Sequence, residues 1–272
     1  MMIVVTGATG NVGRQLVELL TAAGERVTAV SRRTAELPKG VRHVRADLDD
    51  PAGLKDAFGG AEVLFLLVAG QDPQALLDGA RAGGVRRVVL LSSQGAGTRP
   101  EFYRHPAAFE DAVRRSGLEW TILRPGGFHS NAYAWAESIR DGRTAAAPFG
   151  HTGLPSVDPA DIAEVAATVL REDGHSGRVY ELTGPAPTTP RDRVAAIGAA
   201  LGAPVRFTEQ TREEARAQML QFMPEQVVEG TLAILGEPLD AERQVSPDVE
   251  RILGRAPRSF AEWAVRNVAA FR

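Results

Sequence analysis

Cysteine is absent from this chain of 272 residues, and several other features that mark particular protein classes are missing. Without cysteine, disulfide bonds, thiolate metal sites and thiol catalysis are excluded. The chain also lacks the Gly-x-Ser-x-Gly elbow of serine hydrolases and the Gly-Lys-Ser/Thr ending of a P-loop. The histidines are scattered without the spacing of metal ligands, so we expect no metal site. They are His43, His105, His129, His151 and His175.

A strong charge imbalance is absent too. There are 31 basic and 34 acidic residues, a net charge of −3, and the pI is about 6.0. This balance argues against nucleic acid or an anionic membrane as the main partner. The longest strongly apolar run, Val63 to Ala69, suits a buried strand and is too short to span a bilayer. No charged segment with a cleavage site marks a signal peptide, so we expect a cytoplasmic protein.

The first half of the chain alternates short apolar runs with segments of helical periodicity. Hydrophobic residues make up 44% of the chain and charged residues 24%, as in ordinary globular proteins. We expect strands at residues 2–5, 26–30, 41–46, 63–68, 88–92 and 119–123, and helices around 11–23, 51–58, 73–83 and 106–116. Strands that are apolar on both faces and separated by helices predict an α/β fold, a Rossmann-type doubly wound parallel sheet.

After residue 125 the pattern predicts a smaller, mostly helical C-terminal substrate lobe. We expect helices at 131–140, after Asp158-Pro159, from Thr189-Pro190 to about 201 and after Thr211, with a strand at 178–183. The expected division is a cofactor domain over residues 1–128 and the lobe over 129–272, interleaved and with an approximate boundary.

Several side chains of the second half have a structural interpretation. Asp158 and Asp161 are expected to cap a helix and complement its dipole rather than form a catalytic pair. The helical stripe of Phe260, Trp263, Ala264, Val268 and Phe271 is expected to pack in a core. Met219, Phe222 and Met223 fit two alternatives, the lining of a substrate pocket or helix–helix packing.

The most specific motif is Thr6-Gly7-Ala8-Thr9-Gly10-Asn11-Val12-Gly13, between a β-branched run and an apolar-periodic helix. Backbone N–H groups at such a helix start point toward an anion, and the helix dipole adds partial positive charge. Glycine is needed where a Cβ would hold a pyrophosphate off or block close helix–strand packing. The motif predicts dinucleotide binding; the alternative is a turn that merely needs a positive φ. The expected cofactor contacts are Gly7, Thr9, Gly10, Asn11, Val12 and Gly13.

The end of the second strand indicates which dinucleotide the chain binds. An NAD site usually has Asp or Glu there, which accepts hydrogen bonds from the ribose hydroxyls. This strand ends in Ser31-Arg32-Arg33, and no carboxylate follows until Glu36. Arginine pairs with a 2′-phosphate and serine can donate to it, so we expect NADPH (NADP+) rather than NADH. A solvated basic loop is the alternative.

Two later strand ends add candidate cofactor contacts. Asp47 and Leu48 follow the third strand, where Asp47 either reaches the adenine amino group or caps the next helix. Leu67 and Val68 end the fourth strand and are expected to line the adenosine.

Together these segments resemble the atypical short-chain dehydrogenase/reductase group, especially its NmrA-like and NAD(P)H-dependent quinone oxidoreductase branches. The resemblance covers about residues 1–185 and rests on residues 6–13, 31–33, 91–93 and 116–128. It implies NADP(H) bound over the glycine turn, with Ser92 and Ser93 at the cofactor. It also implies that the Leu-Arg-Pro-Gly-Gly-Phe turn closes over the nicotinamide through Pro125, Gly126 and Phe128, and that Asn131 and its helix form a substrate wall.

The catalytic residues are less clearly marked. Better-known members of the group carry Tyr-x-x-x-Lys, in which lysine lowers the pKa of the proton-donating tyrosine. Here Tyr103 is followed four positions later by Ala107. Related atypical members often show His-x-x-x-Glu in this place, but here His105 precedes Glu110 by five positions, not four. We expect His105 or Tyr103 near the nicotinamide ribose, with Ser92 as the third candidate; the alternative for His105 is a helix-start residue facing solvent.

The sequence therefore predicts an NADPH-dependent oxidoreductase that transfers hydride to a small aromatic, quinone-like or enone substrate. Such a transfer needs no obligatory protein acid. Phe128, His129, Asn131 and Tyr133 are the expected substrate contacts. Two other functions stay open: a non-catalytic NADP(H)-sensing regulator, and a natural-product tailoring enzyme with non-redox or coupling chemistry. Neither the substrate nor the oligomeric state can be read from the sequence, a homodimer being one candidate.

Overall fold

The computed structural model describes all residues from Met1 to Arg272, and the chain divides into two compact units. The first, here the sheet unit, comprises Met1–Ser93, Arg104–Arg124 and Ala160–Glu181. The second, here the helical unit, comprises Gln94–Tyr103, Pro125–Pro159 and Leu182–Arg272. The chain passes between the two units several times. The predicted assignment of cofactor and substrate binding to residues 1–128 and 129–272 stays a prediction.

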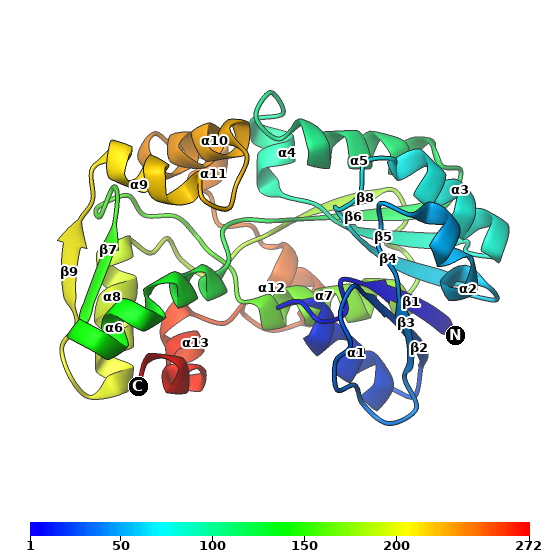
Figure 1. The fold of residues 1–272 in the computed structure, drawn as a ribbon, viewed down its shortest axis with the longest axis horizontal. Coiled ribbons are helices and arrows are strands. Elements are labelled where there is room, and N and C mark those ends of the chain that lie inside the picture. Colours follow the sequence, from blue (N-terminus) through cyan, green and yellow to red (C-terminus); the bar gives the residue numbers. More distant parts are fainter. The chain divides into compact units, whose positions relative to one another are not determined.

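A seven-stranded sheet forms the centre of the sheet unit, with the strand order β3-β2-β1-β4-β5-β6-β8 (Figure 1). The strands are β1 (Met2–Thr6), β2 (Arg26–Ser31), β3 (Arg42–Arg45), β4 (Val63–Leu67), β5 (Arg87–Leu91), β6 (Glu119–Pro125) and β8 (Arg178–Leu182). Strands β1 to β6 pair in parallel. The order reverses between β1 and β4, and ligands of such sheets bind at the carboxyl ends of the strands beside this reversal.

Helices cover both faces of this sheet, as the predicted doubly wound fold requires. They are α1 (Gly13–Ala22), η1 (Pro51–Leu54), α2 (Lys55–Phe58), α3 (Pro73–Gly83), α5 (Arg104–Arg115) and α7 (Pro159–Arg171). Figure 1 shows α1 and α7 on one side of the strands and α3 and α5 on the other. The core between the sheet and α2, α3 and α5 contains Phe58, Leu64, Leu77, Val88 and Phe109. Every strand and helix expected in the first half is present, with ends that match the expectation or differ from it by one or two residues; the helix expected at 51–58 is η1 followed directly by α2.

The helical unit is built from short helices and one small sheet. Its elements are α4 (Gln94–Thr98), η2 (His129–Trp135), α6 (Ala136–Gly142), β7 (Thr144–Ala147), α8 (Pro190–Leu201), β9 (Arg206–Glu209), α9 (Arg212–Met219), α10 (Glu225–Gly236), α11 (Asp240–Arg243), α12 (Asp248–Leu253), α13 (Phe260–Arg266) and η3 (Val268–Phe271). The parallel pair β7–β9 is not predicted, because the sequence Thr-Ala-Ala-Ala of β7 has low β propensity and forms a strand only through pairing.

Local signals in the second half fix several helix starts. Thr189 and Thr211 each form a capping box, at the start of α8 and α9. The C-terminal stripe is confirmed as core, because Phe260, Trp263 and Phe271 are almost fully buried together. No helix of the structure has the length and apolarity needed to span a membrane.

The two acidic residues at the start of α7 are both buried. Asp161 lies in the first turn of α7, which confirms its dipole position. Asp158 forms an ion pair with Arg266. Met219 and Met223 pack against the cluster of Ala215, Val228 and Leu232, whereas Phe222 is 69% exposed. Packing is therefore the observed role of the two methionines.

Candidate cofactor and active site

The glycine turn after β1 needs glycine for two different reasons. Gly7 has a φ of +64°, and a Cβ there would lie 2.8 Å from Cδ2 of Leu67. A Cβ on Gly13 would overlap the carbonyl group of Gly7. The Gly10 N–H closes the turn by donating to the Gly7 oxygen at 2.9 Å. A side chain at position 7 would clash with Leu67 of β4, and one at position 13 would push the start of α1 away from the turn.

The start of α1 is arranged to receive an anion. Val12 provides no side-chain cap, and the first turn contains no acidic residue. A Cβ on Gly10 would contact only the Gly7 oxygen, at 3.3 Å, and no other protein atom within 4 Å. The space beside Gly10 is therefore empty of protein atoms, and a side chain at this position would fill it. Uncapped N–H groups and the positive end of the helix dipole suit the pyrophosphate of a dinucleotide, so the residues present fit this group.

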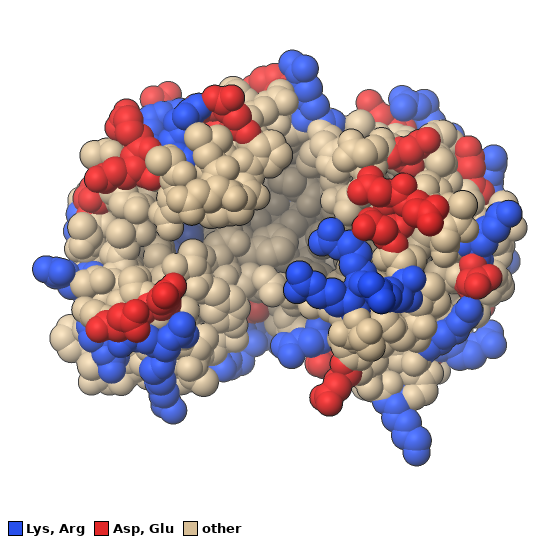
Figure 2. Space-filling view, in the orientation of Figure 1, with Lys and Arg blue, Asp and Glu red and all other residues tan.

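The carboxyl end of β2 is basic, as predicted. Arg32 and Arg33 are exposed, and neither pairs with a carboxylate. The hydroxyl of Ser31 is 2.7 Å from the Arg33 carbonyl oxygen, to which it donates, and 2.9 Å from Nε2 of His43. On this face of the sheet unit Figure 2 shows Lys and Arg side chains gathered beside an acidic group. Arg32 and Arg33 thus offer positive charge to a 2′-phosphate, but the Ser31 hydroxyl already donates its proton to a backbone oxygen of the protein.

Two of the other candidates for the adenosine, Asp47 and Leu48, follow the edge strand β3. Asp47 accepts a hydrogen bond from the Asp49 N–H at 3.2 Å, while Asp50 caps η1. The alternative role of Asp47 as the helix cap is therefore wrong, and its contact with adenine stays a prediction. Leu48 is buried, and a Cβ on Gly70 would lie only 2.5 Å from the Leu48 oxygen. This contact keeps the loop after β4 against the end of β3.

Ser92, just beyond β5, belongs to a buried cluster centred on Glu110 of α5. The Ser92 hydroxyl donates to Oε1 of Glu110 at 2.7 Å. Arg124 holds the same carboxylate with Nε at 2.9 Å and Nη2 at 2.7 Å, and Arg114 adds a hydrogen bond at 2.9 Å. Burial by itself would raise the pKa of Glu110, but the hydrogen bonds from Arg124 and Ser92 lower it below the ordinary value.

This geometry determines what Ser92 can do. Its only proton is held by an ionised carboxylate, so its oxygen is left as a hydrogen-bond acceptor. Sequence reasoning treated Glu110 only as a misplaced partner of His105. A stronger signal was available: Glu110 lies on the buried face of an amphipathic helix, where a carboxylate requires a cation.

The two candidate proton donors are placed differently. His105, in the first turn of α5, is exposed, and its Nε2 donates to the Gly70 carbonyl oxygen at 2.7 Å. Tyr103 belongs to the helical unit, where its hydroxyl lies 3.3 Å from Oγ1 of Thr231. Burial raises the pKa of Tyr103 above its ordinary value. Both side chains have hydrogen-bonded structural positions, and their catalytic roles stay predictions.

In the helical unit, the turn after β6 is anchored by its backbone. The Gly126 N–H donates to the Leu182 oxygen at 3.0 Å, and Phe128 forms a bridge with Val157. The N–H of Asn131 donates to the Phe128 oxygen at 3.1 Å. Tyr133 is 39% exposed, and its hydroxyl donates to Oδ1 of Asn267 at 2.6 Å. The ring of Tyr133 packs beside Trp263 and Phe271, with centroids 5.1 and 6.1 Å away, so it is only partly exposed.

His129 is the one predicted substrate contact that is deeply buried. It is 2% exposed and packs edge-on against Phe260, with ring centroids 5.2 Å apart. Its Nδ1 has no hydrogen-bond partner. Burial is the main cause that lowers the pKa of His129 to about 3, and nearby Arg193 and Arg266 add to the effect. His129 is therefore neutral at pH 7.

Comparison with known proteins gives the family. A family model described as NAD(P)H-binding matches residues 7–173, which include the glycine turn, the basic strand end and the Ser92–Glu110 cluster. The chain belongs to this NAD(P)H-binding family. It is an NAD(P)H-dependent oxidoreductase of the atypical short-chain dehydrogenase/reductase type, in the quinone oxidoreductase branch, as its motifs predicted.

Three similar proteins illustrate the relationship. The chain is 36% identical to a (4-alkanoyl-5-oxo-2,5-dihydrofuran-3-yl)methyl phosphate reductase of Streptomyces griseus, over 99% of both chains. It is 32% identical to an NAD(P)H azoreductase of Xenophilus azovorans, again over 99% of both. The crystal structure of the NADPH-dependent quinone oxidoreductase QOR2 of Escherichia coli has a TM-score of 0.80, with 26% identity over 97% of this chain and 99% of that one.

Within this NAD(P)H-binding protein, the predicted site residues fall into two groups. The sheet unit brings together at the carboxyl ends of its strands most of the predicted cofactor residues, with Ser92, Ser93 and His105. Tyr103, Pro125, Gly126, Phe128, His129, Asn131 and Tyr133 belong to the helical unit.

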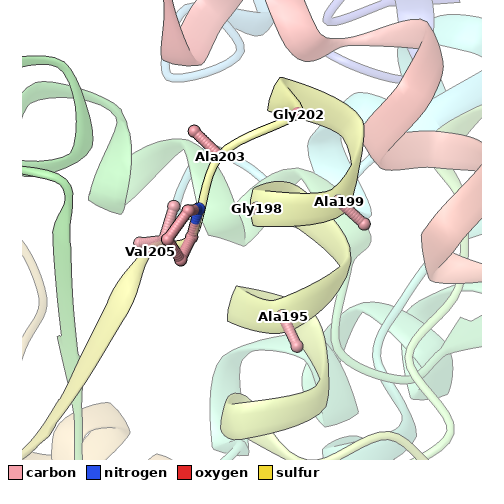
Figure 3. Close-up of a pocket in the computed structure, with 7 residues that line it drawn as sticks. Ala195, Gly198, Ala199, Gly202, Ala203 and Val205 are labelled. Carbon is pink, nitrogen blue, oxygen red and sulfur yellow. The ribbon is translucent and has the colours of Figure 1, made fainter.

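A surface hollow of the helical unit is separate from all of these residues. It has a volume of about 440 Å³ and lies between the end of α8 and the chain leading into β9. Figure 3 shows its lining, which includes Ala195, Ala199 and Val205. No titratable side chain lines it, so it offers no catalytic chemistry.

Proposed function

We propose that this oxidoreductase uses NADPH to reduce an electron-poor conjugated double bond in a small aromatic, quinone-like or enone molecule. The observation that carries the proposal is the 36% identity, over 99% of both chains, to a reductase named for an oxo-dihydrofuran substrate. The second relative is named for azo compounds and the structural neighbour for quinones. A conjugated enone, an azo group and a quinone all accept hydride at one end of a polarised π system.

The preference for NADPH rests on charge. Arg32 and Arg33 are exposed without a carboxylate partner, where an NAD-specific site would place an acidic residue. A guanidinium binds a phosphate dianion through charge-assisted hydrogen bonds, whereas it gains little from the ribose hydroxyl of NADH.

The nicotinamide, when bound, supplies the hydride. The residues of this chain would bind and orient the cofactor. The glycine turn and the start of α1 would hold the pyrophosphate, and Ser92 would offer its oxygen as a hydrogen-bond acceptor to the nicotinamide half. Glu110 and Arg124 keep the Ser92 oxygen in that orientation. Because reduction of a conjugated acceptor leaves a delocalised anion, water can supply the proton, and the absence of Tyr-x-x-x-Lys is compatible with turnover.

The substrate contacts and the setting of the protein belong to the same proposal. We assign the substrate to Phe128, Asn131 and Tyr133, which is 39% exposed, because aromatic side chains suit a flat aromatic ligand. A cytoplasmic location, a homodimer and the absence of nucleic-acid or membrane partners are likewise proposed, the last on the balanced charge.

The test begins with the purified protein, titrated with NADPH and NADH while nicotinamide fluorescence is followed. NADPH oxidation is then measured with a quinone, an azo dye, an acyl-dihydrofuranone and, as a control, a saturated ketone. We expect tighter binding of NADPH and oxidation with conjugated acceptors only. Tight binding without oxidation by any acceptor would instead favour the sensing regulator, and substrate conversion without NADPH consumption would favour non-redox chemistry.

A further inference from the structure

The edge of the large sheet brings a third arginine to the basic strand end. Strand β3 is the edge strand, and its parallel register pairs Arg45 with Ser31 of β2. Arg45 thus ends β3 at the level at which Arg32 and Arg33 follow β2. The sequence does not reveal this neighbourhood, because Arg45 lies 13 residues after Arg32 and has no motif of its own.

The side chain of Arg45 is directed to this place by the backbone. Its Nε donates to the carbonyl oxygen of Arg32 at 3.2 Å. The remaining guanidinium N–H groups make no hydrogen bond or ion pair within the protein, and the residue is exposed. One end of the guanidinium is therefore anchored beside Arg32, and the other is available to a ligand.

The hydroxyl of Ser31 already makes two hydrogen bonds within the protein. Its hydroxyl hydrogen is directed to the Arg33 carbonyl oxygen at 2.7 Å, so Nε2 of His43, at 2.9 Å, donates to its oxygen. A hydroxyl has one proton, and a phosphate dianion offers only acceptors. The Ser31–His43 pair holds the backbone at Arg33 but cannot donate to a phosphate in this arrangement.

We infer that Arg45 is a specificity-determining residue that donates to the 2′-phosphate of NADPH, in the role that Ser31 was expected to fill. This inference rests on the proposed NADPH preference. Three guanidinium groups without carboxylate partners, from the ends of two adjacent strands, would bind a dianion through several N–H groups at once. NADH has no charge at this position, so its binding gains nothing from Arg45.

The experiment compares Arg45→Ala with Arg42→Ala. Arg42 lies on the same strand and is also exposed, but it pairs with Thr28 at the opposite end of β3. Dissociation constants for NADPH, NADH and 2′,5′-ADP are measured by calorimetry, with circular dichroism as the check on folding. We expect Arg45→Ala to weaken NADPH and 2′,5′-ADP about tenfold, the loss of one charge-assisted contact, and to leave NADH unchanged. Arg42→Ala should match the wild type for all three ligands.

A Ser31→Ala variant separates the two donors. Because its hydroxyl proton faces the backbone, we expect the ratio of NADPH to NADH affinity to stay within about threefold of the wild type. An Arg45→Ala protein with the same ratio of NADPH to NADH affinity as the wild type would overturn the role of Arg45. A Ser31→Ala protein that by itself loses the preference for NADPH would overturn it too. Wild-type protein that binds both dinucleotides equally would overturn the proposed NADPH preference, and the inference with it.

Discussion

Each unit buries one ionisable side chain of special interest, and the two are treated in opposite ways. Glu110 of the sheet unit is kept charged by hydrogen bonds from Ser92, Arg114 and Arg124. His129 of the helical unit is kept neutral, with its Nδ1 unpartnered and two arginines nearby. Burial removes both groups from water, but only the carboxylate receives hydrogen bonds that replace the lost hydration.

The difference teaches how each unit uses charge. In the sheet unit the paired carboxylate fixes a hydroxyl at the carboxyl end of β5, where Rossmann-type folds bind their cofactor. In the helical unit the neutral imidazole fills space between aromatic rings, including Phe260 and Trp263. The first arrangement orients a polar atom, and the second makes the core sensitive to acid.

The largest effect is expected from breaking the sheet-unit cluster. Glu110→Ala leaves Arg124 half-buried without its main partner, which should cost about 3–5 kcal/mol of unfolding free energy. The matched control is Asp111→Ala, which removes a neighbouring carboxylate that is 61% exposed and 3.7 Å from Arg114. The control should lose no more than about 1 kcal/mol. Urea unfolding measures both, and equal losses would contradict the central role of Glu110.

As the pH falls, His129 of the helical unit should lower the stability of the fold before Glu110 does. The pKa of His129 is about 3 in the folded protein against 6.5 ordinarily, so below pH 6.5 the unfolded chain takes up a proton that the folded protein refuses. Stability that is full above pH 6.5 is therefore lost as the pH falls toward 3, by about 2 kcal/mol between pH 7 and 5.

The matched protein for this measurement is His129→Gln, which does not titrate there. Its unfolding free energy should depend less on pH in that window, even if it is lower throughout. The lowered pKa of Glu110 acts in the same direction but only below about pH 4.5, where the native pairing is lost on protonation. Identical pH slopes for the wild type and His129→Gln would show that His129 is not the group responsible.

The smallest expected effect tests whether the Glu110 cluster contributes to cofactor binding through Ser92. Ser92→Ala removes one hydrogen-bond acceptor, which should raise the Kd for NADPH about three- to tenfold and change kcat by less than about threefold. Ser116→Ala, in which a hydroxyl that donates to the Val113 oxygen is lost, should leave the Kd unchanged. If instead kcat falls a hundredfold while the Kd stays constant, Ser92 acts as a donor to the substrate.

Sequence reasoning succeeded where the signal is local. Gly7 and Gly13 are required by a positive φ and by a close backbone approach within one turn. The predicted helix at 73–83 is observed with the same ends, because Asp72 caps it and Pro73 fills its first position. The predicted helix starts at Thr189 and Thr211 are equally local, since the threonine side chain at each accepts a hydrogen bond from the N–H three residues on.

Sequence reasoning missed what depends on long-range contacts. Glu110 meets Ser92, 18 residues away, only because α5 packs on β5. Arg45 meets Arg32 only because β3 pairs with β2. The alanine-rich strand β7 exists only because β9 lies beside it.

By itself, the sequence determined the Rossmann-type sheet, the glycine turn that receives a dinucleotide and the basic end of β2, since each depends on backbone geometry or periodicity over a few neighbouring residues. Only the tertiary structure decided that Ser92 is an acceptor, that Ser31 is engaged with His43 and that His129 is buried and neutral. The proton positions and pKa values of these groups depend on partners that folding brings from distant parts of the chain.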